Sequence, residues 1–170
     1  MENNWKIDET HSEINFKVKH MMISTVTGNF ESFDAKVESS DDSFKDAKFQ
    51  FNADIESVNT RNKDRDTHLK SEDFFNAEKF PKLSFKSTAF DGEKLKGELT
   101  IKDVTKEVEL DVDFNGVAED PYGQTKAGFD METSINRKDF DLTWSAVTEA
   151  GSIVVSDKVK LIANVQFVKQ

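Results

Sequence analysis

The sequence predicts an all-β protein built as an antiparallel barrel of about eight strands, with a helical excursion between the third and fourth strands. Apolar and polar residues alternate along several segments, and turn residues separate these segments. Fifteen Phe accompany only two Trp and one Tyr. Phenylalanine rings carry no polar group, so they belong in a dry interior. A two-sheet sandwich is the competing architecture, but long strands in sequential order favour a barrel.

The first three strands are predicted at residues 12–20, 30–37 and 47–55. In the first, alternate residues from Ser12 to His20 form the apolar face, which directs His20 toward the interior. In the second, Phe30 and Phe33 have opposite parity, and a bulge or bend near Ser32 would bring both rings to one face. The third strand alternates without exception.

Residues 60–81 interrupt this alternation with a polar stretch that is followed by aromatic residues. Thr60 or Asn62 can cap a helix N-terminus, and acidic residues follow in the first turn, where the helix dipole favours them. A second short turn starts at Ser71, so one long amphipathic helix is not expected. At about twenty residues the segment is too long for a hairpin loop, and we expect it to cover the mouth of the barrel.

Five further strands are predicted at residues 83–87, 95–101, 108–114, 129–137 and 159–167. Asp91-Gly92 marks a tight hairpin between the first two of them. Segments 102–105 and 120–123 have the composition of turns. Residues 138–155 form an irregular stretch before the last strand.

Length and composition limit the classes of function. A chain of 170 residues fits one domain, spanning residues 1–170, that can surround a cavity. The net charge of −10 disfavours nucleic acids and anionic membranes as partners, although a local basic patch is compatible with it. No cysteine is present, which excludes disulfides and thiolate chemistry. Neither a signal peptide nor an apolar run of transmembrane length occurs, so we expect a cytoplasmic protein without stable membrane insertion.

Motifs for catalysis and metal binding are weak. The three histidines are His11, His20 and His68, and the spacing of the first two directs them to opposite faces if they share one strand. A site with three histidine ligands is therefore not expected. No nucleophile elbow or phosphate-binding glycine loop occurs, and the carboxylates lie mainly at outward positions. We expect neither an enzyme nor a cofactor.

Two polar residues, His20 and Arg137, continue apolar faces and are predicted to point inward. A histidine in such a position is either a hydrogen-bonded core residue or a ligand contact. A buried arginine needs an anion or several acceptors. An ion pair with Asp64, Asp66 or Asp139 would satisfy Arg137 without any ligand.

Arg65, Asp66 and His68 lie within one helical turn of the excursion. One interpretation is a structural network that ties the excursion to the barrel rim. The other is a role of Arg65 and His68 in holding a ligand head group. The sequence leaves both interpretations open.

Several blocks of the sequence are typical of one family. The longest is S-V-N-T-R-N-K-D-R-D-T-H-L-K-S-E-D-F-F-N-A-E-K-F-P-K-L-S-F at residues 57–85. The others are D-E-T-H-S-E-I-N-F-K-V-K-H at 8–20, G-N-F at 28–30, G-E-L-T-I at 97–101, D-P-Y-G at 120–123 and R-K-D-F at 137–140. In these blocks the sequence resembles the YceI-like family over nearly the whole chain. Asp103 and Asp141 stand where we expect glycine in that family, and aspartate tolerates a positive φ there with slight strain.

The resemblance implies a lipocalin-like barrel around a long apolar channel that holds an isoprenoid chain, with the head group near the mouth. The expected function is non-catalytic binding, storage or transport of a polyprenyl phosphate or diphosphate, or of an isoprenoid quinone. The residues assigned to the lipid tail are Ile14, Phe16, Val18, Phe49, Phe51, Phe74, Phe75, Phe85, Leu99, Ile101, Phe129, Met131 and Ile135. Those assigned to the head group are His20, Arg65, His68 and Arg137.

Two alternatives stay open. An enzyme could act on such a lipid with His20 or His68 as its acid–base group. A filled barrel could instead serve protein interaction, which an interior without a continuous cavity would favour. The lipid is the expected partner, and a homodimer is compatible with the sequence.

Overall fold

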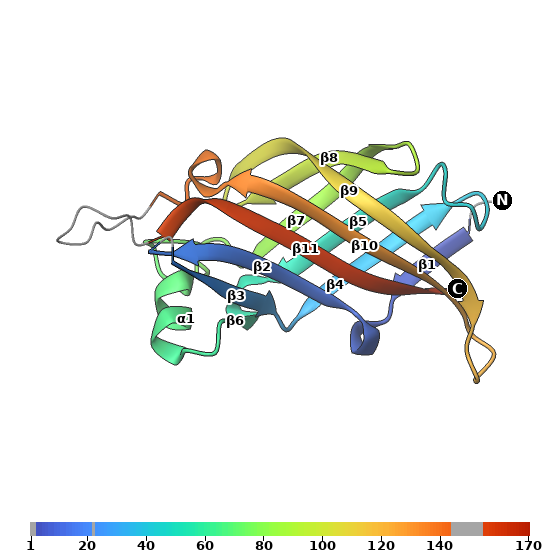
Figure 1. The fold of residues 1–170 in the computed structure, drawn as a ribbon, viewed down its shortest axis with the longest axis horizontal. Coiled ribbons are helices and arrows are strands. Elements are labelled where there is room, and N and C mark those ends of the chain that lie inside the picture. Colours follow the sequence, from blue (N-terminus) through green and yellow to red (C-terminus); the bar gives the residue numbers. More distant parts are fainter. Residues whose placement is uncertain (1–2, 22, 144–154) are drawn as a thin grey trace.

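The computed structural model describes residues 3–21, 23–143 and 155–170. They form an elongated, closed antiparallel barrel, with both termini at one end and helix α1 at the other (Figure 1). The strands are β1 (Asn3–Ile7), β2 (Glu13–His20), β3 (Ser24–Phe30), β4 (Phe33–Ser39), β5 (Lys48–Asp54), β6 (Val58–Asn59), β7 (Lys82–Phe90), β8 (Lys94–Ile101), β9 (Val104–Glu119), β10 (Thr125–Asn136) and β11 (Val155–Lys169). The helices are η1 (Glu9–His11), η2 (Ile55–Ser57), α1 (Lys63–Lys70) and η3 (Arg137–Phe140). Within these ranges, no helix is long and apolar enough to cross a bilayer.

The described strands make eight barrel strands in sequential order, because the first three barrel strands each consist of two segments. β1 and β2 both pair with β11, through Ile7 with Phe167 and Glu13 with Asn164. β4 pairs with β1 and β5, while β3 pairs with β2 and β6. The contact between β1 and β11 closes the ring. The predicted barrel of about eight antiparallel strands is confirmed, and so is the helical excursion between its third and fourth strands.

Three of these segments, β1, β3 and β6, are absent from the sequence prediction, and β6 has only two residues. β1 has only five residues, too few to establish a pattern, and β3 has Val26 as its only large apolar residue before Phe30. The chain breaks between β3 and β4 at residues 31–32, where a bulge or bend is predicted, and both Phe30 and Phe33 are buried. Of the irregular stretch predicted at 138–155, residues 144–154 lie outside the described ranges.

The turns agree with the sequence in all but one detail. Gly92 has a φ of 98°, and the carboxylate of Asp91 accepts two backbone N–H groups, which confirms the predicted hairpin. Asp141 has a φ of 62°, as expected where it replaces glycine. The same expectation is wrong for Asp103. Residues 102 and 103 form a two-residue turn between β8 and β9. The left-handed residue of this turn is the first one, Lys102, with a φ of 57°.

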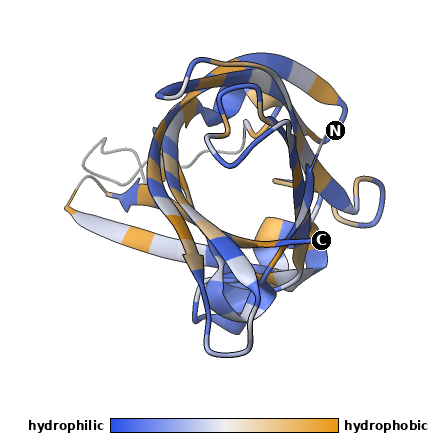
Figure 2. Ribbon diagram, turned by 90° about the vertical axis from the view of Figure 1, so that its right-hand side faces the viewer, coloured by the Kyte–Doolittle hydropathy of each residue, from blue (hydrophilic) through white to orange (hydrophobic). Residues whose placement is uncertain are grey.

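Hydropathy alternates along the barrel strands, as the banding in Figure 2 shows. In β8, for example, Leu95, Leu99 and Ile101 are buried, whereas Lys94 and Lys96 are exposed. This alternation is what a sheet with one inner and one solvent-facing side requires. It leaves most of the interior apolar.

Aromatic rings fill the half of the barrel near the termini. Phe129 lies at the centre of this group, with its ring centroid 5.1 Å from that of Phe44, 5.3 Å from Phe49 and 6.0 Å from Phe167. The ring of Trp5 packs against Phe44 at 5.0 Å. All five side chains are at most 1% exposed. We call these five residues the aromatic plug.

Phe44 reaches the plug from the loop between β4 and β5, at the end of the barrel near the termini (Figure 1). Its φ of 58° and the hydrogen bond from its N–H to the carbonyl of Asp41 belong to a tight turn within this polar loop. Sequence alternation does not reveal Phe44, because the residue lies outside every strand. A single Phe in the loop S-D-D-S-F-K-D-A is the only sign of it.

Candidate functional site

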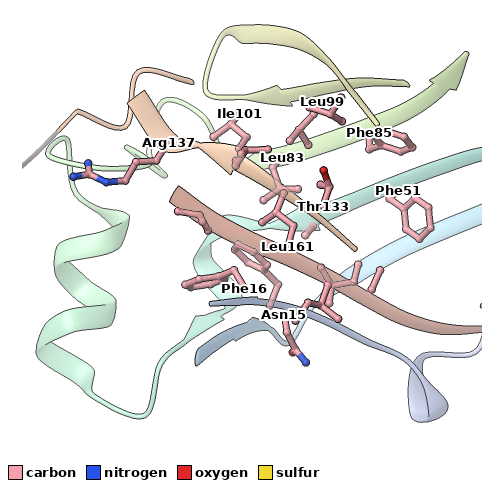
Figure 3. A pocket seen from close by; sticks show the side chains of 18 of the residues that line it. Asn15, Phe16, Phe51, Leu83, Phe85, Leu99, Ile101, Thr133, Arg137 and Leu161 are labelled. Atoms are coloured by element: carbon pink, nitrogen blue, oxygen red, sulfur yellow. The ribbon is translucent and has the colours of Figure 1, made fainter. Parts of the chain in front are cut away.

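The half of the barrel toward α1 contains a cavity of about 160 Å³. It extends from Arg137 near the mouth to Phe51 and Phe85 beside the aromatic plug (Figure 3). Its lining is apolar apart from Asn15, Asn52, Thr133 and Arg137. Apolar cavities of about 150 Å³ stay dry and bind small apolar molecules. The barrel is therefore filled at one end and hollow at the other.

Most of the predicted tail residues line this cavity, namely Ile14, Phe16, Val18, Phe51, Phe74, Phe75, Phe85, Leu99, Ile101, Met131 and Ile135. Phe49 and Phe129 do not, because they belong to the aromatic plug. The expectation that these two rings line the channel is wrong. Strand parity reports which face a residue occupies, but it cannot report how far along the barrel that face is open.

Further lining residues were not assigned to the tail from the sequence. Val108 and Leu110 of β9 and Leu161 of β11 line the cavity at positions that share the inward parity of their strands. Their parity was a signal that could have identified them. Leu69 of α1 and Leu142 after η3 also line the cavity, but they lie outside any alternating pattern.

Two glycines make room for rings that lie against the cavity wall. Gly28 pairs with Phe16 across β2 and β3, and a Cβ at Gly28 would lie 2.3 Å from Cζ of Phe16. A Cβ at Gly97 would lie 2.5 Å from Cζ of Phe85. Both distances are below van der Waals contact, so these rings occupy the space of missing side chains. Two of the rings that line the cavity thus take up less of its space than they would beside larger residues.

Gly28→Ala should push the Phe16 ring into the lumen and weaken binding of an apolar ligand, because lumen space is lost. Gly128→Ala is the matched control, since a Cβ there has its nearest heavy atom 3.6 Å away. Titration of both variants with one fluorescent prenyl probe measures the effect. Equal affinities of the two variants would contradict the proposed packing of Phe16.

The excursion covers one side of the cavity. β6 pairs with β3 and not with β7, so the sheet is open between β6 and β7 on the mouth side, where residues 60–81 lie between them in the chain. Leu69, Phe74 and Phe75 of this segment line the cavity. The structure thus places the segment at the mouth, as its length and composition predict.

Polar contacts hold α1 in place. Asn62 caps the helix by accepting the N–H of Arg65, as predicted. Nε of Arg65 donates to the hydroxyl of Thr60 at 2.7 Å, and a carboxylate oxygen of Asp66 accepts the N–H of Thr60 at 2.8 Å. Thr60 itself is buried. These contacts match the structural interpretation of Arg65 and Asp66.

Arg137 lies at the start of η3 and is 3% exposed. It donates to the carbonyl of Leu142 from Nη1 at 2.6 Å, to that of Ser156 from Nε at 3.0 Å, and to that of Val155 from Nη2 at 3.4 Å. A carboxylate oxygen of Asp157 lies 3.7 Å from Nη2. Burial lowers the pKa of Arg137, and the charge of Asp157 opposes this shift. The guanidinium therefore holds η3 against the start of β11.

The acidic partners predicted for Arg137 are wrong. Asp66 binds Thr60, and neither Asp64 nor Asp139 forms an ion pair with Arg137 among the described residues. The true partner, Asp157, lies on β11. Antiparallel pairing of β10 and β11 brings Arg137 and Asp157 together. A search limited to acidic residues close to Arg137 in the sequence does not find this partner.

The histidines do not converge. His20 ends β2 with an exposed side chain and does not line the cavity, so the predicted inward orientation is wrong. His68 contacts Asp73 at 2.9 Å, and its ring lies 5.1 Å from that of Phe74. His11 contacts Asp8 at 2.8 Å. Among the residues that the structure describes, no group of His, Asp and Glu side chains could hold a metal ion.

The four residues assigned to the head group thus have different surroundings. Only Arg137 lines the cavity, while His68 packs on Phe74, a lining residue. Arg65 and His20 are exposed. Their assignment to a head group stays a prediction.

Known proteins match the chain in sequence and in fold. A family model described as "YceI-like domain" matches residues 5–167. The UPF0312 protein SA2479 of Staphylococcus aureus strain N315 is 36% identical over 165 residues, which cover 96% of each chain. The solved Campylobacter jejuni YCEI protein is 35% identical with a TM-score of 0.75, over 89% of this chain and 90% of that one. A polyisoprenoid binding domain from Saccharophagus degradans shares the fold, with a TM-score of 0.74 at 15% identity over 98% of both chains. The chain belongs to the YceI-like family.

Proposed function

We propose that the protein binds an isoprenoid lipid without chemical change, and stores or transports it. The observation that carries this proposal is the apolar cavity, which ends at the aromatic plug and has its mouth beside α1. Rings and methyl groups on every side suit a prenyl chain, which offers no hydrogen bonds. The polyisoprenoid binding domain with the same fold supports this class of ligand.

Affinity alone does not select the tail length. Burial of each carbon contributes at most about 0.8 kcal/mol, so a tail of roughly forty carbons would formally exceed the ceiling of about 20 kcal/mol on non-covalent affinity. Ordering of the chain and imperfect fit must offset much of that gain. The position of the aromatic plug sets the depth of the cavity, and we propose that this depth limits how much of the tail is enclosed.

We further propose a neutral head group, such as that of an isoprenoid quinone. Arg137 is the cavity-lining cation among the described residues, and its donors are directed at the carbonyls of Leu142, Val155 and Ser156. A diphosphate would have to compete with these bonds. Residues 144–154 contain no Lys, Arg or His. A polyprenyl phosphate or diphosphate is therefore the weaker candidate.

A catalytic role finds less support. An acid–base histidine needs to reach the ligand, yet His20 is exposed and His68 is engaged with Asp73 outside the cavity lining. A barrel filled throughout would favour an interaction module, whereas this barrel has a hollow half. We propose a binding protein, with no cofactor besides its lipid.

Native mass spectrometry of protein purified without detergent tests the proposed function. We expect a bound mass that organic solvent releases and that fragments as a prenyl compound. A bare polypeptide under gentle ionisation, together with no uptake of added prenyl quinone, would count against lipid carriage.

Arg137→Gln should destabilise the protein and leave quinone binding intact. The change leaves buried carbonyls without donors, and each unsatisfied group costs about 1 to 3 kcal/mol. We expect affinity for a prenyl quinone to vary little with salt, or with pH between about 5.5 and 8.5, a window that brackets the usual histidine pKa of about 6.5. Urea denaturation and titrations with a quinone and a diphosphate of equal tail length check both parts. Tighter, salt-dependent diphosphate binding that Arg137→Gln removes would refute the neutral head group.

A further inference from the structure

The turn between β2 and β3 is apolar, unlike other turns of the barrel. Its sequence is Met-Met-Ile, and Ile23 is 81% exposed. The turns after β7 and β9 contain Asp91-Gly92 and Asp120-Pro121, which is ordinary turn chemistry. Three consecutive apolar residues are unusual in a turn, and Ile23 presents its side chain to solvent. A contact with an apolar phase would account for this exposure.

This turn lies at the mouth of the cavity. β2 ends and β3 begins at the same end of the barrel as α1 (Figure 1). Val18, two residues before His20 at the end of β2, lines the cavity, and so does its pairing partner Val159. The turn therefore follows, after Lys19 and His20, on a strand that forms part of the cavity wall.

Four lysines occupy the outer side of that wall. They are exposed and alternate with the cavity-lining residues of β2 and β11: Lys17, Lys19, Lys158 and Lys160. Lys17 lies directly opposite Lys160. Like charges in that position on neighbouring strands reduce stability. In a chain of net charge −10, such an arrangement indicates a partner with negative charge.

Only part of this charge is neutralised within the protein. Lys160 forms an ion pair with Glu132 at 3.2 Å, whereas Lys19 donates only to the neutral hydroxyl of Thr25 at 2.9 Å. Lys17 and Lys158 form no ion pair with the residues that the structure describes. The acidic residues beside them are Glu132 on β10 and Asp157 on β11, and Asp157 contacts Lys138 at 3.3 Å and Arg137 at 3.7 Å.

We propose that the mouth of the barrel docks on an anionic lipid bilayer, with Ile23 in the interface and the four lysines above the lipid phosphates. This proposal rests on the proposed function, because a lipid carrier must exchange its cargo with a membrane. An apolar tip beside basic residues binds membranes through both burial and charge. The net charge of −10 opposes close approach of the rest of the protein to the bilayer, so docking is weak and reversible, and Ile23 with the four lysines orients it.

Vesicle flotation tests the docking. The vesicles consist of phosphatidylcholine, alone or with about one third phosphatidylglycerol. We expect binding to the anionic vesicles only, and loss of binding as salt rises, because the screening length falls from about 30 Å at 0.01 M salt to about 10 Å at 0.1 M. Ile23→Asp should weaken binding more than tenfold, since the transfer of an isoleucine side chain into an apolar phase corresponds to about 1.5 to 3 kcal/mol. Lys17→Gln should weaken it about fivefold, the equivalent of about 1 kcal/mol for one basic residue.

The matched controls lie away from the mouth. Tyr122→Asp changes a side chain that is 89% exposed in the β9–β10 turn at the opposite end, and Lys96→Gln removes one charge from β8 opposite Glu109. Both should bind vesicles as the unchanged protein does. Equal losses in test and control variants, or no binding to anionic vesicles at low salt, would overturn the docking and leave the turn to contact another protein.

The cargo experiment stays separate from this test. Flotation uses protein that has been stripped of lipid and protein that has been loaded with prenyl quinone, and native mass spectrometry reports the load. Lipid carriage without vesicle binding refutes the docking alone. Vesicle binding without any lipid uptake refutes the proposed function and removes the reason for the docking.

Discussion

Phe129→Ala should lower the free energy of unfolding by about 3 to 5 kcal/mol, the range for a large ring removed from a filled core. Phe129 is 1% exposed, and its centroid lies within 6.0 Å of those of Phe44, Phe49 and Phe167. Large rings pack around Phe129 on several sides, so we expect them to fill the new cavity only in part. Urea denaturation of the lipid-free protein measures the loss.

Phe16→Ala is the comparison for this prediction. The Phe16 ring lies on Gly28 and borders the cavity, so its removal enlarges an existing space and forfeits contacts on one side only. We expect a loss well below the lower end of the range for Phe129. Equal losses for the two variants would contradict the division of the barrel into a filled and a hollow half.

Phe51→Asp should cost several kcal/mol or abolish folding, because it places a carboxylate in an apolar interior without a partner. Phe51 lines the inner end of the cavity, 6.2 Å from the ring of Phe167 and 6.2 Å from that of Phe85. The polar residue of β5 that lines the cavity is Asn52. It has the opposite strand parity to Phe51. Thermal and urea denaturation report the loss.

Gln50→Asp introduces the same carboxylate one residue earlier in β5. Gln50 lies between Lys36 of β4 and Lys86 of β7 on the outer face, so the new charge meets lysines and water. We expect a change within about 0.5 kcal/mol. Similar denaturation midpoints for the two variants would refute the inward orientation of Phe51.

The alternating pattern was sufficient for most of the barrel. Long strands such as β5 and β10 repeat their parity often enough to reveal the inner face, and nearly every predicted tail residue lines the cavity as a result. β1 was too short for such a pattern. The tilted junction between β3 and β4 was visible only as the parity conflict of Phe30 and Phe33.

The polar residues were harder to place. His20 follows the parity of β2, but the strand ends there at the barrel rim, where the same face is already exposed to water. Arg137 is buried as predicted, yet its partners among the described residues are three carbonyls and Asp157, and those of β11 lie 18 to 20 residues further along the chain. Hydrogen bonds to backbone carbonyls leave no trace in residue types. The sequence therefore identified a buried arginine but not its partners.

Local chemistry was enough to establish the class of fold, the turns, the capping residue Asn62 and the apolar character of the interior, because each depends on residues near one another in the chain. The distribution of that interior between a filled and a hollow half depended on tertiary structure. Phe44 from a polar loop and Trp5 from a short strand close one end, while Gly28 and Gly97 leave space for two rings at the other. Whether an inward ring fills space or borders it is decided by what lies across the barrel, and those neighbours come from remote parts of the chain.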